Sequence, residues 1–75
     1  MSNEPQQQGT HFYVLTRQKP VNGGVAMATW YGAITPNPGS TRLDIYQWLL
    51  ADTDQKSPHM AGANTVHFSL EPNQL

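Results

Sequence analysis

Three histidines are the residues of this chain best suited to acid–base or metal chemistry near neutral pH. His11 and His67 fall in segments rich in strand-forming residues, and we predict that both lie on one face of a sheet, near Tyr13 and Ser69. Two imidazoles and a hydroxyl could bind a metal ion or exchange protons. A zinc site needs three or four ligands, and the spacing places no third one. We therefore expect solvated or interface histidines, no metal and no cofactor, with His11 and His67 as the candidate ligands if a metal binds.

The sequence lacks the patterns of nucleophilic catalysis. It has no cysteine, no Gly-x-Ser-x-Gly elbow, and no acid at a spacing that would orient His59 in the loop before the last strand. The run Asn22-Gly23-Gly24 is followed by strand-forming residues, whereas a phosphate-binding loop leads into a helix. A chain this short also has few residues with which to line a deep pocket. We predict that the protein is not an enzyme.

The charge balance disfavours nucleic acid as a partner. The 75 residues carry 4 Lys and Arg against 5 Asp and Glu, a net charge of -1, whereas binding to phosphates needs a basic stripe. The alternative is a DNA-binding regulator, because Arg17 and Lys19 lie near a hairpin tip, and a dimer would present two such hairpins to a major groove. No apolar run approaches the roughly 20 residues that span a bilayer, and no signal peptide is evident. We expect a cytoplasmic protein without a membrane partner.

A β-hairpin is the strongest local signal in the sequence. Residues 1–9 are polar and predict a disordered tail, so that residues 10–75 form a single small domain. Two runs of strand-forming residues flank Asn22-Gly23, which suits a two-residue type I′ turn. That turn places Val21 opposite Gly24 and fixes the pairing along both strands. The pairs that follow on one face are Tyr13 with Gly32, Leu15 with Trp30, and His11 with Ile34.

One helix and a third strand complete the predicted domain. Thr41 suits a helix N-cap, with Asp44 at the third helical position, and the helix should fade near Thr53. Residues 54–64 then form a long connection to the run TVHFSLE, which alternates as a strand does. The fold class is therefore α+β, with the order β-β-α-β and a mainly antiparallel three-stranded sheet of order 2-1-3. The helix packs on one face of that sheet through Leu43, Ile45, Tyr46, Leu49 and Leu50.

Both faces of the predicted sheet are apolar, and a single helix can cover one of them. We place the helix over the face that carries Phe12, Val14, Met27, Tyr31, Ala33, Val66, Phe68 and Leu70. The other face then exposes Tyr13, Leu15, Ala26, Ala28, Trp30 and Ile34. Covering several hundred Å² of apolar surface contributes several kcal/mol, at about 25 cal/mol per Å².

A second copy of the chain is the simplest cover for the exposed face, because two-fold dimers are the commonest oligomers. The alternatives are another protein, or cover by the chain's own long connection, tail or C-terminal PNQL segment. We therefore predict a small non-enzymatic protein-interaction module, a homodimer, with the DNA-binding regulator and the His-based metal or ligand domain as alternatives. Trp48 falls outside the helical apolar arc and either contacts a partner or packs at the rim. The predicted partner-binding residues are Tyr13, Leu15, Trp30, Ile34 and Trp48.

Three segments resemble a set of short actinobacterial proteins. They are HFYVLT at positions 11–16, PGSTRLDIY at 38–46 and FSLEPNQL at 68–75. Together they span nearly the whole predicted domain. The resemblance implies a small bacterial cytoplasmic protein and carries no activity.

Overall fold

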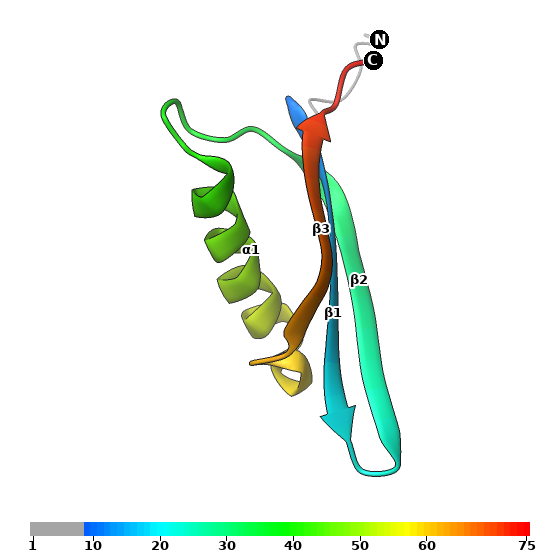
Figure 1. The fold of residues 1–75 in the computed structure, drawn as a ribbon. Helices are drawn as coiled ribbons and strands as arrows, with labels where there is room; N and C mark the ends of the chain where they lie inside the picture. Colours follow the sequence, from blue (N-terminus) through cyan, green and yellow to red (C-terminus); the bar gives the residue numbers. More distant parts are fainter. Residues whose placement is uncertain (1–8) are drawn as a thin grey trace, which may run out of the picture.

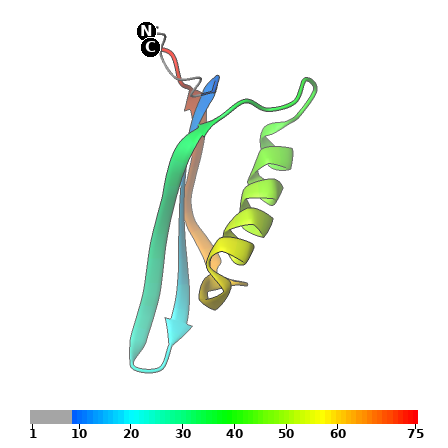
Figure 2. The same cartoon turned by 180° about the vertical axis from the view of Figure 1, so that it is seen from behind.

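The computed structural model describes residues 9–75 as one sheet, one long helix and a short 3-10 turn. The strands are β1 (His11–Val21), β2 (Gly24–Ile34) and β3 (Asn64–Pro72). They form a three-stranded antiparallel sheet in the order β2-β1-β3. Helix α1 (Arg42–Lys56) lies against one face of this sheet, and the two views in Figures 1 and 2 show no described element against the other. The α+β class and the strand order are confirmed.

The β1–β2 hairpin has the predicted register. Val21 pairs with Gly24, and the pairing continues without a shift to His11 and Ile34 at the far end. The predicted type I′ turn is wrong, because it needs positive φ at both central residues, and only Gly23, at 84°, has it. Positive φ at the second central residue alone is the type II pattern, which the same glycine supplies. The two-residue spacing, more than the turn type, therefore fixed the register.

The start of the domain is held by Gly9. Its φ is 106°, and a Cβ added there would lie 2.6 Å from the carbonyl oxygen of Ile34, so that only glycine fits. The carbonyl oxygen of Gly9 accepts a hydrogen bond from the Asn73 side chain at 3.2 Å. Residues 1–8 of the predicted tail lie outside the described residues, whereas Gly9, which we had assigned to that tail, packs against the end of the sheet.

A capping box starts helix α1. The Thr41 hydroxyl accepts a hydrogen bond from the backbone N–H of Asp44 at 3.1 Å, and the Asp44 carboxylate accepts one from the N–H of Thr41 at 3.0 Å. Two N–H groups that have no partner within the helix are thus satisfied, and the carboxylate lies at the positive end of the helix dipole. The predicted N-cap is confirmed.

Replacing Thr41 with alanine should lower the free energy of unfolding by about 1 kcal/mol, because the N–H of Asp44 loses its acceptor. Urea denaturation followed by circular dichroism measures this loss. Thr35→Ala is the matched control, since Thr35 is an exposed threonine in the same connection but outside the helix. An equal loss in both variants would show that the cap does not stabilise the helix.

The hydrophobic core lies between α1 and the face of the sheet formed by β1 and β3. Leu15 and Leu49 have no exposed surface, and Tyr13, Ile45 and Leu70 are each 9% exposed. Our assignment of the helix to the Phe12 face is therefore wrong: α1 covers the Tyr13 face. Leu43, which we had included in the packing arc of the helix, is 59% exposed.

A bulge in β3 changes which of its residues meet the helix. His67 pairs with Thr16 and Thr65 with Arg17, so Val66 is an extra residue between them. Beyond the bulge, Phe68 and Leu70 pair with Leu15 and Tyr13 and share their face. The predicted alternation that grouped Val66 with Phe68 and Leu70 is wrong at Val66, which is 54% exposed.

The connection between α1 and β3 is shorter and more ordered than predicted. The helix continues to Lys56, and the 3-10 turn η1 (Pro58–Met60) follows directly. Met60 is 1% exposed, and its carbonyl oxygen accepts a hydrogen bond from the N–H of Ala63 at 3.0 Å. This segment therefore packs against the domain at the C-terminal end of α1.

Candidate interaction surface

The helix-free face of the sheet carries several exposed apolar side chains that the described residues leave uncovered. It consists of every second residue of each strand, on the side away from α1, because side chains alternate between the two faces. The register assigns to this face Phe12, Val14, Thr16, Gln18 and Pro20 of β1, Val25, Met27, Thr29, Tyr31 and Ala33 of β2, and His67, Ser69 and Glu71 of β3.

Large apolar side chains gather on the β1 and β2 part of the helix-free face, whereas its β3 part is polar. Phe12 is 38% exposed, Met27 58% and Tyr31 72%, and Val25 extends the row toward the hairpin tip at 57%. The rings of Phe12 and Tyr31 lie 6.5 Å apart between centroids, at an angle of 47°. Aromatic pairs and methionine are enriched at protein interfaces, and solvated sheet faces are ordinarily polar. The surface has the composition of a contact site.

The polar groups of this face include one hydrogen-bonded pair of hydroxyls and a single carboxylate. The hydroxyls of Thr16 and Thr29 hydrogen-bond to one another at 2.8 Å. Glu71 is the only acidic residue on the face, where it pairs with Phe12 at one end, and no lysine or arginine is present. A face with so little charge is inexpensive to remove from water, because few ions lose their hydration.

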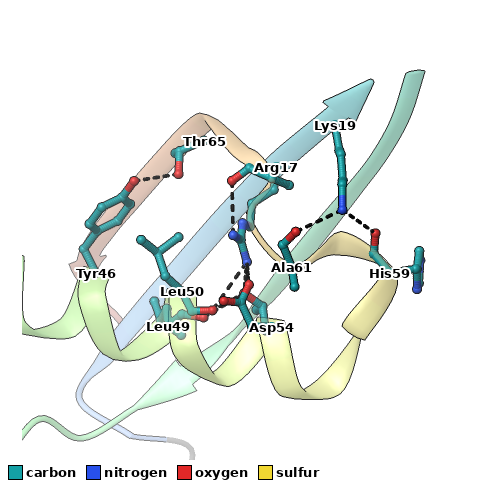
Figure 3. Close-up of polar contacts among 11 residues, drawn as sticks. Arg17, Lys19, Tyr46, Leu49, Leu50, Asp54, His59, Ala61 and Thr65 are labelled. Atoms are coloured by element: carbon teal, nitrogen blue, oxygen red, sulfur yellow. Dashed lines mark hydrogen bonds and ion pairs between the residues drawn. The ribbon is translucent and has the colours of Figure 1, made fainter. Parts of the chain in front are cut away.

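Arg17 holds α1 to the opposite face. Its guanidinium, 2% exposed as a residue, donates from Nη1 to the Thr53 hydroxyl at 2.8 Å and to Asp54 Oδ1 at 2.7 Å. Nη2 donates to the carbonyl oxygen of Ala63 at 3.1 Å, which ties the start of β3 to the same group (Figure 3). Arg17 shares its side of β1 with Leu15, so these bonds reinforce the packing of the helix on that face.

Lys19, which is closer to the hairpin tip than Arg17, also binds the segment that follows α1. Its Nζ donates to the carbonyl oxygens of Ala61 at 3.0 Å and His59 at 3.5 Å (Figure 3). Both cations proposed for the DNA-binding alternative, Arg17 and Lys19, are therefore engaged in contacts within the chain. Lys56 is paired with Asp52 at 2.9 Å, and its hydrogen bond to that carboxylate raises the pKa of Lys56. The hairpin tip does not present a basic stripe.

The two candidate metal ligands lie on opposite faces of the sheet. His67 pairs with Thr16 on the helix-free face, whereas His11 has the parity of Tyr13 and lies on the helix side. Our prediction of a shared face is wrong, because the register of β3 on β1 places His67 opposite Thr16, whose side chain points to the other face from that of His11. Residues 9–75 contain no group of three His, Cys, Asp or Glu side chains that could hold a metal ion.

The predicted partner-binding residues mostly belong to the core. Tyr13 and Leu15 are buried beneath α1, and Trp30 and Ile34 pack partly buried against the same cluster. Those four were predicted to lie on the uncovered face, which is a correction. Trp48 is 52% exposed on α1, as expected, and it borders a hollow of about 360 Å³ with Ile34, Pro36 and Asp44.

The residues that form the uncovered surface were assigned to the wrong face by the sequence analysis. The sequence analysis placed Phe12, Met27 and Tyr31 beneath the helix. Both faces of the sheet nevertheless carry apolar side chains, and the helix covers only one of them. A signal was available at Arg17, because an arginine on an otherwise apolar strand face needs nearby acceptors, and Thr53 and Asp54 near the helix end could supply them.

Among residues 9–75, the segments outside the sheet do not cover the helix-free face. The connection after α1 contacts Arg17 and Lys19 on the helix side. The C-terminal segment returns to the start of β1, where the N–H of Asn73 donates to the carbonyl oxygen of Thr10 at 2.8 Å. Leu75 at its end is fully exposed. Among residues 9–75, intramolecular cover of this face is therefore not observed.

Comparisons with known proteins add no relative to this description. Within the part of the chain that the structure describes, no helix has the length and apolar character needed to cross a bilayer. No protein-family model matches the chain, and neither a curated protein nor a solved structure matches it.

Proposed function

We propose that this protein is a non-enzymatic interaction module that forms a homodimer through the helix-free face of its sheet. The observation that supports this proposal is the row of Phe12, Met27 and Tyr31 on a face that carries one acidic residue and neither lysine nor arginine. Apolar side chains of this size are rarely left together in water by a monomer of 75 residues.

A second copy is favoured over a different protein because the face is nearly uncharged. Two identical surfaces can meet about a two-fold axis when they do not oppose like charges, and Glu71 lies at one end of the surface, away from its centre near Thr16. Two such faces would pack as two sheets do in a sandwich, with α1 of each copy on the outside.

Multi-angle light scattering after size exclusion, at micromolar concentration, tests the proposal. The wild-type particle should have at least twice the 8.3 kDa mass of the chain. Val14→Lys should lower this mass, because a lysine on the central strand would lose its hydration in the contact. The monomer should tolerate the change, since Val14 is only partly buried within it.

Leu43→Lys is the matched control. Leu43 is an exposed apolar residue on α1, 59% exposed, and it lies outside the proposed contact. This variant should keep the wild-type mass. A wild-type particle of 8.3 kDa, or an unchanged mass in Val14→Lys, would refute the proposed interface.

A further inference from the structure

The outer edge of β2 is open to pairing with another strand. β2 lies at one end of the sheet order β2-β1-β3, so its far side has no strand neighbour among the described residues. It is 11 residues long and contains neither a proline nor a charged residue. Its pairing with β1 has no bulge. Charges, prolines and bulges are the devices by which proteins protect edge strands, and β2 has none of them.

The edge formed by β3 has a bulge, a charged residue and a proline, which β2 lacks. β3 has the bulge at Val66, which twists the strand and interrupts its ladder. It also ends in Glu71 and Pro72, and a proline has no N–H to offer to a further strand. Because one edge of the sheet is protected and the other is not, the open edge of β2 is a specific feature of this chain.

Pro20 identifies the backbone groups that point outward from β2. Pro20 pairs with Val25. In a hydrogen-bonded pair each residue donates its N–H to the other, and proline has no N–H, so Pro20 and Val25 form a non-hydrogen-bonded pair. Hydrogen-bonded and non-hydrogen-bonded pairs alternate along an antiparallel ladder. The residues of β2 whose N–H and C=O groups point away from β1 are therefore Val25, Met27, Thr29, Tyr31 and Ala33.

This outward set is self-complementary about Thr29. If β2 of a second copy runs antiparallel with Thr29 at the centre, Thr29 faces itself, Met27 faces Tyr31, and Val25 faces Ala33. On the helix side, Trp30 then faces Ala28, a large side chain beside a small one. No charged residue meets another anywhere along the strand. Cross-strand pairs of this kind stabilise a sheet.

We infer that β2 pairs with β2 of a second copy about a two-fold axis through Thr29, so that the two sheets become continuous. The axis stands perpendicular to the sheet, so both α1 helices lie on one side and both helix-free faces lie on the other. The helix does not obstruct the contact, because its fully buried partners are on β1 and β3. This contact is separate from the face-to-face contact proposed above, and the two together would close a tetramer.

Thr29→Pro tests the edge contact with Thr29→Ala as its control. Proline removes an outward N–H and leaves the hydrogen bonds to β1 in place. Both variants lose the bond between the Thr16 and Thr29 hydroxyls, so the difference between them reports the edge alone. Light scattering should show that Thr29→Pro has half the wild-type mass, while Thr29→Ala keeps it. Equal masses for all three proteins would overturn the inference.

Amide hydrogen exchange tests the same contact in the unmodified protein. The amides of Met27, Thr29 and Tyr31 should be protected at micromolar concentration as strongly as those of Ala28 and Trp30, which face β1. Outward amides that exchange as fast as the amide of Gly39 in the loop would overturn the inference, even if the protein is a dimer.

The outcomes separate the two contacts. If Val14→Lys lowers the mass and Thr29→Pro does not, the face contact stands and the edge contact is refuted. If Thr29→Pro lowers the mass and Val14→Lys does not, the edge contact stands and the proposed function through the helix-free face is refuted. A wild-type monomer with unprotected outward amides refutes both.

Discussion

Arg17→Ala should lower the free energy of unfolding by about 3 kcal/mol, a large part of the stability of a domain this small. The substitution leaves the carbonyl oxygen of Ala63 and the hydroxyl of Thr53 without their donor, and it empties the space that the buried side chain fills. It also removes the group that joins β1 to the end of α1 and to the start of β3. Urea denaturation at a fixed protein concentration measures the loss.

Asp54→Ala is the control that separates the ion pair from the rest of this network. The Asp54 side chain is 39% exposed, against 3% for Arg17, so solvent screens their attraction. We expect a loss of roughly 0.5–1 kcal/mol, the value of a surface pair. Equal losses in the two variants would show that the ion pair, and not the buried hydrogen bonds, accounts for the contribution of Arg17.

Leu15→Ala should cost about 3 kcal/mol of unfolding free energy, because Leu15 has no exposed surface and its removal leaves a cavity beneath α1. Thermal and urea denaturation both report this loss. The result would also test the corrected face, since a residue on an exposed surface would cost far less in the monomer.

Leu43→Ala makes the same chemical change at a position that is 59% exposed. Its unfolding free energy should stay within about 0.5 kcal/mol of the wild-type value. If Leu15→Ala behaved like Leu43→Ala, the helix could not be packed on the Tyr13 face, and the helix-free surface proposed here would be assigned to the wrong side.

The elements of this fold could be predicted because each depends on residues close together in the sequence. The two-residue spacing at Asn22-Gly23 fixes the hairpin register by counting, whatever the turn type. The cap at Thr41 and Asp44 requires only a spacing of three residues. The strand order is compatible with a right-handed crossover and agrees with the apolar residues on both sides of β1. The turn type failed because Asn22 does not adopt positive φ.

The face of the sheet that carries the helix could not be obtained in the same way. β1 has apolar residues on both parities, so hydrophobic periodicity gives equal support to either side. The register of β3 on β1, which sets His67 opposite Thr16, and the bulge at Val66 are marked by no turn or breaker residue. The five residues proposed to bind a partner followed from that choice, and four of them lie in or against the core.

The sequence by itself determined the strands, the helix, their order, and the fact that two apolar faces share one helix, because these follow from local pairing and from the arithmetic of hydrophobic positions. The tertiary structure alone decided which face is left open. Arg17 contributes to this choice, because its buried guanidinium bonds to acceptors on α1 and just before β3 that lie 36 to 46 residues away along the chain. Contacts over such separations leave no local pattern, and the resulting packing leaves Phe12, Met27 and Tyr31 on the face through which we propose that a second copy binds.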